Sequence, residues 1–257
     1  MPRSSGASNR NTPQCVAVMA ALNSPRAVCL LSGGMDSAVS TAQAIADGCE
    51  VYALSFDYGQ RHKVELAAAQ RVARSLKVRD HRVVQLDLRA IGGSALTSEL
   101  AVPKDRLEAE MGVGVPVTYV PARNLIFLSF ALALAETVGA RAIYLGVNAI
   151  DYSGYPDCRQ EFLTAFAHTA ALATAAGAEQ GARFEIRAPL VALSKRDIVL
   201  RARALGVDLG LTHTCYDPHE TQGVVQACGR CDACSLRLKG FADAGLIDPI
   251  LYGKDEV

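Results

Sequence analysis

A glycine turn between a predicted strand and a predicted helix constrains this chain more than any other feature. The turn reads Ser-Gly-Gly-Met-Asp-Ser at residues 32–37, with apolar residues 27–31 before it and a helix-like segment after it. Glycines let backbone N–H groups turn toward an anion, and the following helix points its positive end to the same place. The turn is therefore typical of a phosphate-binding site. An ordinary strand–helix junction, with Asp36 or Ser37 as the helix cap, fits the six residues equally well.

Strands and helices alternate along the rest of the chain. Strands are predicted at residues 28–31, 51–56, 81–86, 142–146 and 184–188, and helices at residues 36–47, 63–76, 124–138 and 159–176. A further helix is expected to open at a capping box, residues 194–197, and to end at residue 205. This alternation predicts an α/β fold, a parallel sheet with helices on both faces. Residues 87–121, with several glycines and prolines, are expected to form an irregular excursion or lid.

Polar residues follow three of the predicted strands. Residues 32–37, 57–60 and 146–151 each begin where a strand ends. In open parallel sheets, ligands bind at the carboxyl ends of the strands. One crevice should therefore gather all three segments.

Composition narrows the classes of function. Lys and Arg together number 26, as do Asp and Glu, so the formal net charge is zero. Proteins that grip nucleic acid usually carry a basic excess, so a small substrate is favoured and no nucleic-acid partner is expected. The longest apolar run, residues 125–135, is too short to span a bilayer, so no membrane partner is expected either. Residues 1–24 are predicted to be a disordered tail rather than a signal peptide.

Four of the eight cysteines are clustered near the C-terminus, with spacings of 12, 2 and 2 residues. They are Cys215, Cys228, Cys231 and Cys234. Four thiolates suit tetrahedral Zn²⁺, and a closed site of this kind is structural. Unligated buried cysteines, an iron–sulfur cluster, and His213 or His219 as a competing ligand are the alternatives. Such clustering does not fit a disulfide framework, which favours a reducing, cytoplasmic location.

Motifs across most of the chain resemble one enzyme family. The turn at residues 32–37 resembles the PP-loop of the ATP-pyrophosphatase superfamily, whose members cleave ATP between the α- and β-phosphates. Residues 56–62, 119–124 and 146–159 resemble the QueC/ExsB family, the 7-cyano-7-deazaguanine synthases of queuosine precursor synthesis. The match runs from residue 28 to residue 238 in the family's order, and residues 148–159 discriminate best. The Cys215–Cys228 gap is longer than the family pattern, and residues 217–222 look like an insertion.

The resemblance implies a fold, a reaction and cofactors. The fold would be adenine nucleotide α-hydrolase-like, with an ATP-binding domain at residues 25–206 and a zinc-binding region with a C-terminal helix at residues 207–257. The activity would be that of an ATP-dependent carbon–nitrogen ligase that converts 7-carboxy-7-deazaguanine and ammonia to 7-cyano-7-deazaguanine. ATP, Mg²⁺ and a structural Zn²⁺ held by the four cysteines would be needed, and the family suggests a homodimer.

The motifs and their chemistry also give candidate site residues. Nucleotide binding is expected of Leu31, Ser32, Gly33, Gly34, Met35, Asp36, Ser37, Asp57 and Arg123. Catalysis is expected of Asp36, Ser37 and Lys195. Substrate binding is expected of Tyr58, Gln60, His62, Asn148, Asp151, Tyr152, Tyr155, Asp157 and Arg159. Structural roles are the alternative for several: a turn cap for Asp57, and solvated helix starts for His62, Arg123 and Lys195. A structural or substrate-lining role is expected of Cys158.

Two other classes of function remain open from the sequence. A different PP-loop enzyme, such as a tRNA thiolase or lysidine synthetase, would act on tRNA, and a basic surface or a tRNA-binding appendage would be expected. Neither is visible in the sequence. A non-enzymatic zinc-binding module, in which the glycine turn is incidental, predicts no ATP-dependent chemistry.

Overall fold

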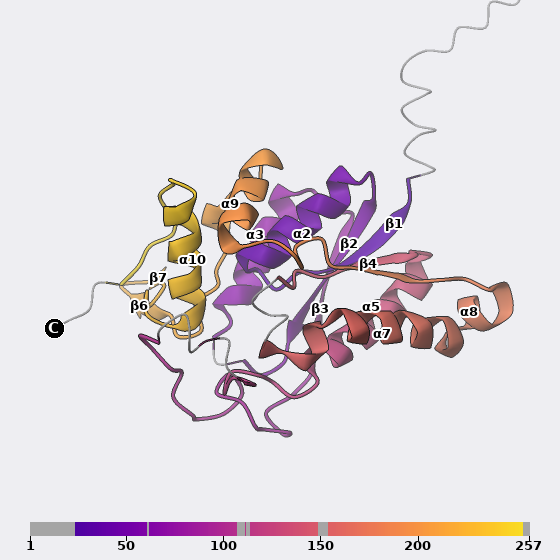
Figure 1. Ribbon diagram of the computed structural model, residues 1–257, viewed down its shortest axis with the longest axis horizontal. Coiled ribbons are helices and arrows are strands. Elements are labelled where there is room, and N and C mark those ends of the chain that lie inside the picture. Colours follow the sequence, from indigo (N-terminus) through magenta and orange to yellow (C-terminus); the bar gives the residue numbers. More distant parts are fainter. Residues whose placement is uncertain (1–23, 61, 107–110, 112–113, 149–153, 254–257) are drawn as a thin grey trace, which may run out of the picture.

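Five parallel strands form the central sheet of the protein. The computed structural model describes residues 24–60, 62–106, 111, 114–148 and 154–253 (Figure 1). The strand order is β3-β2-β1-β4-β5. The strands are β1 (Arg26–Leu30), β2 (Glu50–Asp57), β3 (Asp80–Gln85), β4 (Ala142–Tyr144) and β5 (Glu185–Arg187). The order reverses between β1 and β4, where a ligand crevice is expected in a sheet of this kind.

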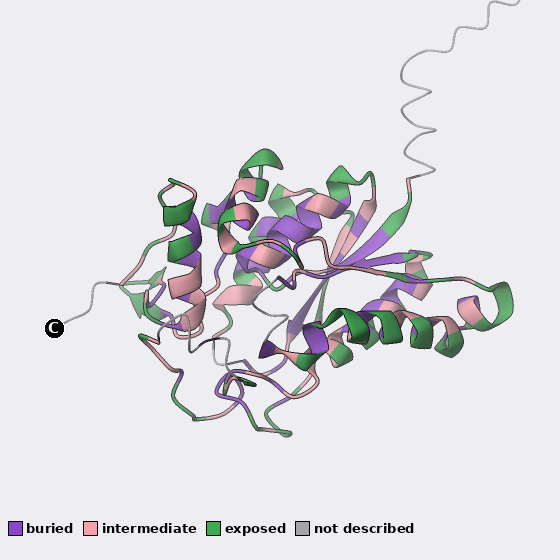
Figure 2. Ribbon diagram, in the orientation of Figure 1, coloured by how far each residue is buried: buried purple, intermediate pink, exposed green. Residues whose placement is uncertain are grey.

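Helices cover both faces of the sheet, as the sequence predicts. On one face lie α2 (Met35–Ala46), α3 (Val64–Ser75) and α9 (Lys195–Ala204), and on the other α5 (Arg123–Val138) and α7 (Gln160–Ala173) (Figure 1). Alternate residues of β1 serve the two faces: Val28 packs with Leu128 of α5, whereas Cys29 packs with Ala44 of α2. The inner strands β1, β2 and β4 are mostly buried between these layers, whereas the edge strands β3 and β5 are more exposed (Figure 2). The predicted fold class is confirmed.

The C-terminal region carries a small hairpin and a last helix. The hairpin joins β6 (His219–Thr221) to β7 (Val224–Gln226), and α10 (Asp232–Asp243) packs beside α9 (Figure 1). The hairpin overlaps the expected insertion, residues 217–222, only at residues 219–222. Gln222 and Gly223 form its two-residue loop with φ of 52° and 77°. Positive φ at both positions matches the right-handed twist of the flanking strands, which explains why a hairpin forms here.

One predicted helix is in fact two. The sequence predicts a continuous helix over residues 159–176, but α7 ends at Ala173 and a separate α8 (Ala175–Gln180) follows. Thr174 between them is extended, with φ −109° and ψ 149°, and its hydroxyl accepts a hydrogen bond from the Gly177 amide. Thr174 therefore caps α8, and this local bond competes with helix continuation.

Four further segments can be compared with what the sequence predicts. The capping box at residues 194–197 is present, with Ser194 and Asp197 bonding reciprocally at the start of α9. In the described parts of residues 87–121 no strand joins the sheet. None of the described helices is both long and apolar enough to cross a membrane. The predicted disordered tail at residues 1–24 lies, except for Ser24, outside the described residues.

Candidate active site

A cavity of about 260 Å³ opens at the carboxyl ends of β1, β2 and β4. All three segments that the sequence places in one crevice border it or bond to its lining. Of the predicted site residues, the following line the cavity: Leu31, Ser32, Gly34, Met35, Asp36, Ser37, Tyr58, Gln60, His62, Arg123, Tyr155 and Lys195. Apolar side chains, among them Phe56 and Phe127 stacked at 3.9 Å, line another part of the same cavity. A ligand with both a flat apolar portion and a charged portion would match this lining.

The glycine loop leaves the N-terminus of α2 open to the cavity. The N-cap of α2 is Gly34, and no side chain caps it, so the alternative that Asp36 or Ser37 caps the helix is wrong. The Ser37 hydroxyl donates instead to the Gly34 carbonyl at 3.0 Å, and it lies 3.0 Å from the Ser32 hydroxyl. Uncapped helix amides are donors without an intrahelical partner, which suits them to bind phosphate.

Gly33 must be a glycine because the loop lies against α3. Its φ is 92°, and a β-carbon added there would lie 2.2 Å from the Glu65 carbonyl oxygen. No L side chain fits that space. The close approach holds the loop in the turned conformation that aims its amides at the cavity.

Asp36 is held by two partners and keeps one oxygen unpaired. Its Oδ2 accepts hydrogen bonds from Lys195 Nζ at 2.5 Å and from Asn148 Nδ2 at 3.2 Å. Its Oδ1 is buried and has no hydrogen-bond partner among the described residues. A buried carboxylate oxygen without a donor is costly unless a cation satisfies it. This oxygen fits a Mg²⁺ ligand, since Mg²⁺ at phosphate sites uses one or two protein carboxylates.

Hydrogen bonds from its own polar side chains stabilise the segment that follows β2, residues 58–60. Gln60 accepts a hydrogen bond from the Tyr58 amide at 2.8 Å and donates to the Phe56 carbonyl at 3.2 Å. Asp57 pairs with Lys63 at 2.8 Å, and it is not among the residues that line the cavity. His62 lies 3.8 Å from Asp217. Gln60 therefore holds the turn that carries Tyr58 into the cavity.

Arg123 and Glu65 bring two partly buried ionisable groups into the cavity. Burial alone would lower the pKa of Arg123, but nearby Tyr58, Tyr155, Tyr216 and Asp157 raise it overall, so the guanidinium stays charged. Burial raises the pKa of Glu65 to about 7, partly offset by Arg123. A carboxyl with this pKa can take up or release a proton near neutral pH. The sequence gives no sign of this, because Glu65 looks like an ordinary polar residue in the first turn of a helix.

The segment 148–159 divides into residues inside and outside the site. Asn148 is buried against Asp36, and Tyr155 lines the cavity with its hydroxyl 3.2 Å from that of Thr118. Asp157 is buried and accepts hydrogen bonds from the backbone amide and side chain of Asn124, so it anchors the start of α5. Arg159 is exposed and does not line the cavity. Asp151 and Tyr152 lie outside the described residues.

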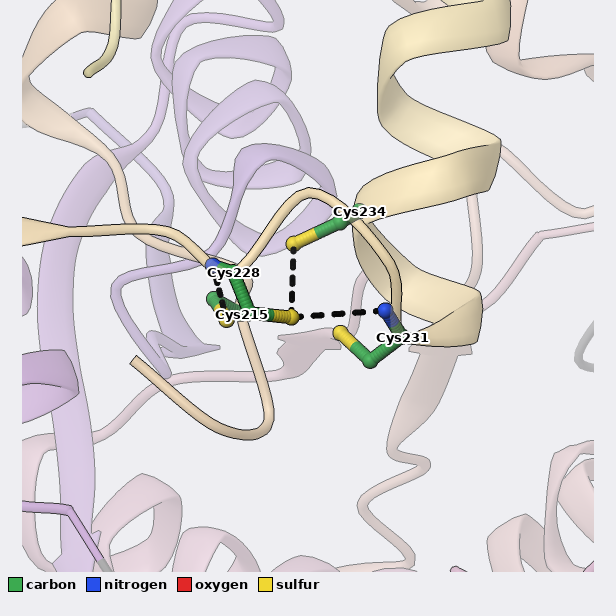
Figure 3. A group of neighbouring side chains, drawn as sticks. All are labelled: Cys215, Cys228, Cys231 and Cys234. Atoms are coloured by element: carbon green, nitrogen blue, oxygen red, sulfur yellow. Dashed lines mark hydrogen bonds between the residues drawn. The ribbon is translucent and has the colours of Figure 1, made fainter. Parts of the chain in front are cut away.

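The four clustered cysteines form a compact thiol site. Their sulfurs all lie within 4.8 Å of one another and point inward (Figure 3). All four are buried. Backbone amides of Cys228 and Cys231 donate to the sulfurs of Cys215 and Cys228 at 3.2 and 3.3 Å. Tetrahedral zinc with Zn–S of about 2.3 Å needs sulfurs about 3.8 Å apart, so this set fits Zn²⁺ with only small movements.

The histidine alternatives do not enter this cluster. Among the described residues, the group that could hold a metal contains the four cysteines alone. His219 is exposed on β6. His213 is buried and lines the cavity, and burial together with Arg237, Arg71 and His62 lowers its pKa to about 4. His213 and the adjacent Thr214, which also lines the cavity, are site residues that sequence reasoning missed.

A parallel α/β sheet with an uncapped glycine loop after its first strand has the layout of a phosphate-binding α/β protein. The sequence pattern described as "Queuosine biosynthesis protein QueC" matches residues 26–245. The chain belongs to the QueC family, as its motifs predict. It is 58% identical over 227 residues to the 7-cyano-7-deazaguanine synthase of Geotalea daltonii, covering 88% of this chain and 96% of that one. It is 59% identical to the synthase of Myxococcus xanthus, covering 88% and 97%.

Solved structures of other enzymes are more distant. The NMN synthetase of Francisella tularensis has 16% identity and a TM-score of 0.45, covering 92% of this chain and 87% of that one. The NH3-dependent NAD synthetase of Campylobacter jejuni has 18% identity and a TM-score of 0.38, covering 76% and 73%. At these TM-scores neither structure supports a conclusion about this chain.

Proposed function

We propose that this enzyme converts 7-carboxy-7-deazaguanine and ammonia to 7-cyano-7-deazaguanine in queuosine biosynthesis, at the expense of ATP. The observation that carries the proposal is the uncapped glycine loop, which faces one cavity together with Asp36 and Lys195. Relatives named 7-cyano-7-deazaguanine synthase, 56–59% identical over about nine-tenths of the chain, support the choice of reaction. As a carbon–nitrogen bond-forming, ATP-dependent enzyme it would be a ligase.

The reaction needs activation because a carboxylate is a poor electrophile. The substrate carboxylate attacks the α-phosphorus of ATP, the bond to the β-phosphate oxygen breaks, and pyrophosphate leaves. Ammonia then adds to the carbonyl carbon, AMP leaves, and one N–H proton is lost, which gives the amide. The amide oxygen attacks a second ATP in the same way. AMP then leaves with that oxygen, and loss of both N–H protons forms the nitrile.

The cavity residues would have separate roles in these steps. The loop amides and the hydroxyls of Ser32 and Ser37 would hold the pyrophosphate portion of ATP. Arg123 and Lys195 would offset charge that develops on the phosphates. Mg²⁺, held through Asp36, would neutralise the phosphate oxygens when bound. Holding the carboxylate beside the α-phosphorus would contribute to the rate enhancement.

The flat deazaguanine ring would occupy the aromatic part of the cavity. Tyr58 and Tyr155 line it, and Phe127 lies 5.5 Å from Tyr58 between ring centroids. Aromatic faces bind a planar heterocycle, while polar side chains bind its edge. Asn148, Asp151, Tyr152 and Asp157 remain proposed edge contacts, and Arg159 a proposed contact for the carboxylate.

The cysteines would hold structural zinc, since four thiol ligands leave no open position for a substrate. We retain the proposal of a homodimer without a nucleic-acid partner, in a reducing compartment that keeps the thiols free. An ATP-binding domain at residues 25–206, followed by a zinc-binding region, is part of the same proposal.

Mass spectrometry tests the proposed reaction directly. Purified protein, the carboxy substrate, ammonia and Mg-ATP should give the nitrile, and omission of ammonia should abolish it. Tight tRNA binding in a gel shift, with no nitrile formed, would favour the tRNA-modifying alternative instead.

A further inference from the structure

A short segment before the first zinc-cluster cysteine crosses directly over the glycine loop. The His213 amide donates a hydrogen bond to the Gly33 carbonyl at 2.8 Å. A β-carbon added at Gly34 would lie 3.1 Å from Thr214 Cγ2 and 3.7 Å from the His213 carbonyl oxygen. His213 and Thr214 therefore form part of the cavity wall directly against the loop, although they lie about 180 residues further along the chain.

Three buried polar atoms around this wall have no partner among the described residues. They are Nε2 of His213, Oγ1 of Thr214 and Oδ1 of Asp36. All three residues line the same cavity. Buried polar atoms in native proteins are almost always paired, so three unpaired atoms in one cavity indicate a ligand that pairs with them.

The chemistry of the three atoms selects the class of ligand. A threonine hydroxyl and an imidazole N–H donate to anionic oxygens, whereas a carboxylate oxygen needs a cation or a donor. A polyphosphate carrying a divalent cation offers both in one ligand. The loop, whose helix amides have no side-chain cap, borders the same cavity.

We propose that His213 and Thr214 bind phosphate oxygens of the nucleotide beside the glycine loop, and that the zinc cluster holds them in place. The inference rests on the proposed use of ATP, but it assigns to the cysteine region a part in nucleotide binding.

Both ends of this wall are attached to the cysteine region, which supports the proposal that the zinc cluster holds His213 and Thr214 in place. On one side, Thr212 Oγ1 accepts a hydrogen bond of 2.7 Å from Arg237 of α10. On the other side, Thr214 is bonded covalently to Cys215, whose sulfur accepts hydrogen bonds from two backbone amides. Cys234 lies on the same helix as Arg237. Metal binding by the cysteines would thus fix both ends of the wall at once.

Calorimetric titration of the full-length protein with Mg-pyrophosphate, and separately with AMP, tests the proposal. Thr214→Val keeps the shape of the side chain but removes its hydroxyl, and we expect it to weaken pyrophosphate binding about tenfold. Thr214→Ser keeps the hydroxyl and should bind within about twofold of the wild type. Both should bind AMP as the wild type does. His213→Leu should match Thr214→Val, and circular dichroism checks that each variant is folded.

The same calorimetric titration with Mg-pyrophosphate tests whether zinc positions the wall. Protein stripped by a chelator and still folded should lose pyrophosphate affinity about as much as Thr214→Val, and added Zn²⁺ should restore it. Unchanged affinity in Thr214→Val, or the same loss in Thr214→Ser, overturns the phosphate contact. Should Thr214→Val not fold, Thr214→Ala replaces it with the same expectation. A wild type that binds Mg-pyrophosphate through Thr214 but forms no nitrile would refute the proposed function alone.

Discussion

Lys195 Nζ donates a hydrogen bond of 2.5 Å to Asp36 Oδ2, which joins the start of α9 to the glycine loop across 159 residues of sequence. The two side chains are only 15% and 18% exposed, so the pair is largely shielded from water. With Oδ2 engaged in this way, Oδ1 is the oxygen left for a cation. Lys195 is therefore a cavity residue, and the alternative of a solvated helix-start lysine is wrong.

We expect Lys195→Met to lower the rate of nitrile formation about 100-fold, because a fixed positive charge beside the phosphates is lost. Steady-state rates by mass spectrometry measure this. Lys239→Met is the matched control, since it breaks an exposed ion pair with Asp243 and neither residue lines the cavity. The control should keep the wild-type rate. Equal rates for Lys195→Met and the wild type would contradict the role given to Lys195.

A second ion pair should matter for stability. Arg237 is 1% exposed and pairs with Asp248, 3% exposed, through two hydrogen bonds. Arg237→Met leaves the Asp248 carboxylate buried without its partner, so we expect the free energy of unfolding to fall by about 3–5 kcal/mol. Urea denaturation measures it. Arg26→Met, which removes the exposed pair with Glu50, should cost less than about 1 kcal/mol.

Glu65 should make stability depend on pH. Its pKa is raised from 4.5 to about 7 on folding, so the folded state binds this proton more tightly than the unfolded state does. Stability is therefore highest below pH 4.5 with respect to this group, and falls as pH rises through 7. Glu65→Gln should remove that loss.

At pH 8 we expect Glu65→Gln to be more stable than the wild type by about 2 kcal/mol, less than the full shift implies because cavity water screens the carboxylate. Well below pH 4.5 the two should be equally stable. The exposed Glu179→Gln should show no such dependence. Parallel stability curves for Glu65→Gln and the wild type from pH 5 to 8 would refute the prediction.

Cys231→Ser tests the zinc assignment. Removing one of the four thiols should reduce bound zinc from about one ion per chain to near none, as measured by mass spectrometry of the metal. We expect the melting temperature to fall by about 10 °C or more. Cys49→Ser is the control, since this cysteine lies outside the cluster and should leave the zinc content unchanged. Full zinc occupancy in Cys231→Ser would rule out the four-sulfur set.

The sequence could predict the sheet and most of the loop residues because both depend on local pattern. The apolar runs mark β1 and β2, and the polar segments after them line the cavity. The break at Thr174 could not be predicted, because an alanine-rich segment favours helix on both sides of it. The position of the break is decided by the Thr174 hydroxyl, which caps α8.

A different reason explains why three cavity residues could not be predicted from the sequence. Glu65, His213 and Thr214 reach the cavity through contacts between segments far apart in sequence, and nothing in their neighbours marks them. Arg159 is the opposite case. Its chemistry suits a carboxylate, but it begins α7 on the exposed side, and its assignment remains a prediction. Residue chemistry indicates what a side chain can bind, and only packing decides where it points.

The product balance of the reaction with ¹⁵N-ammonia, the carboxy substrate and Mg-ATP tests the two adenylation steps most directly. We expect a nitrile that carries one ¹⁵N atom, formed together with two AMP and two pyrophosphate. ADP and inorganic phosphate in place of AMP and pyrophosphate, or a product that stops at the amide with a single AMP, would contradict adenylation of first the carboxylate and then the amide.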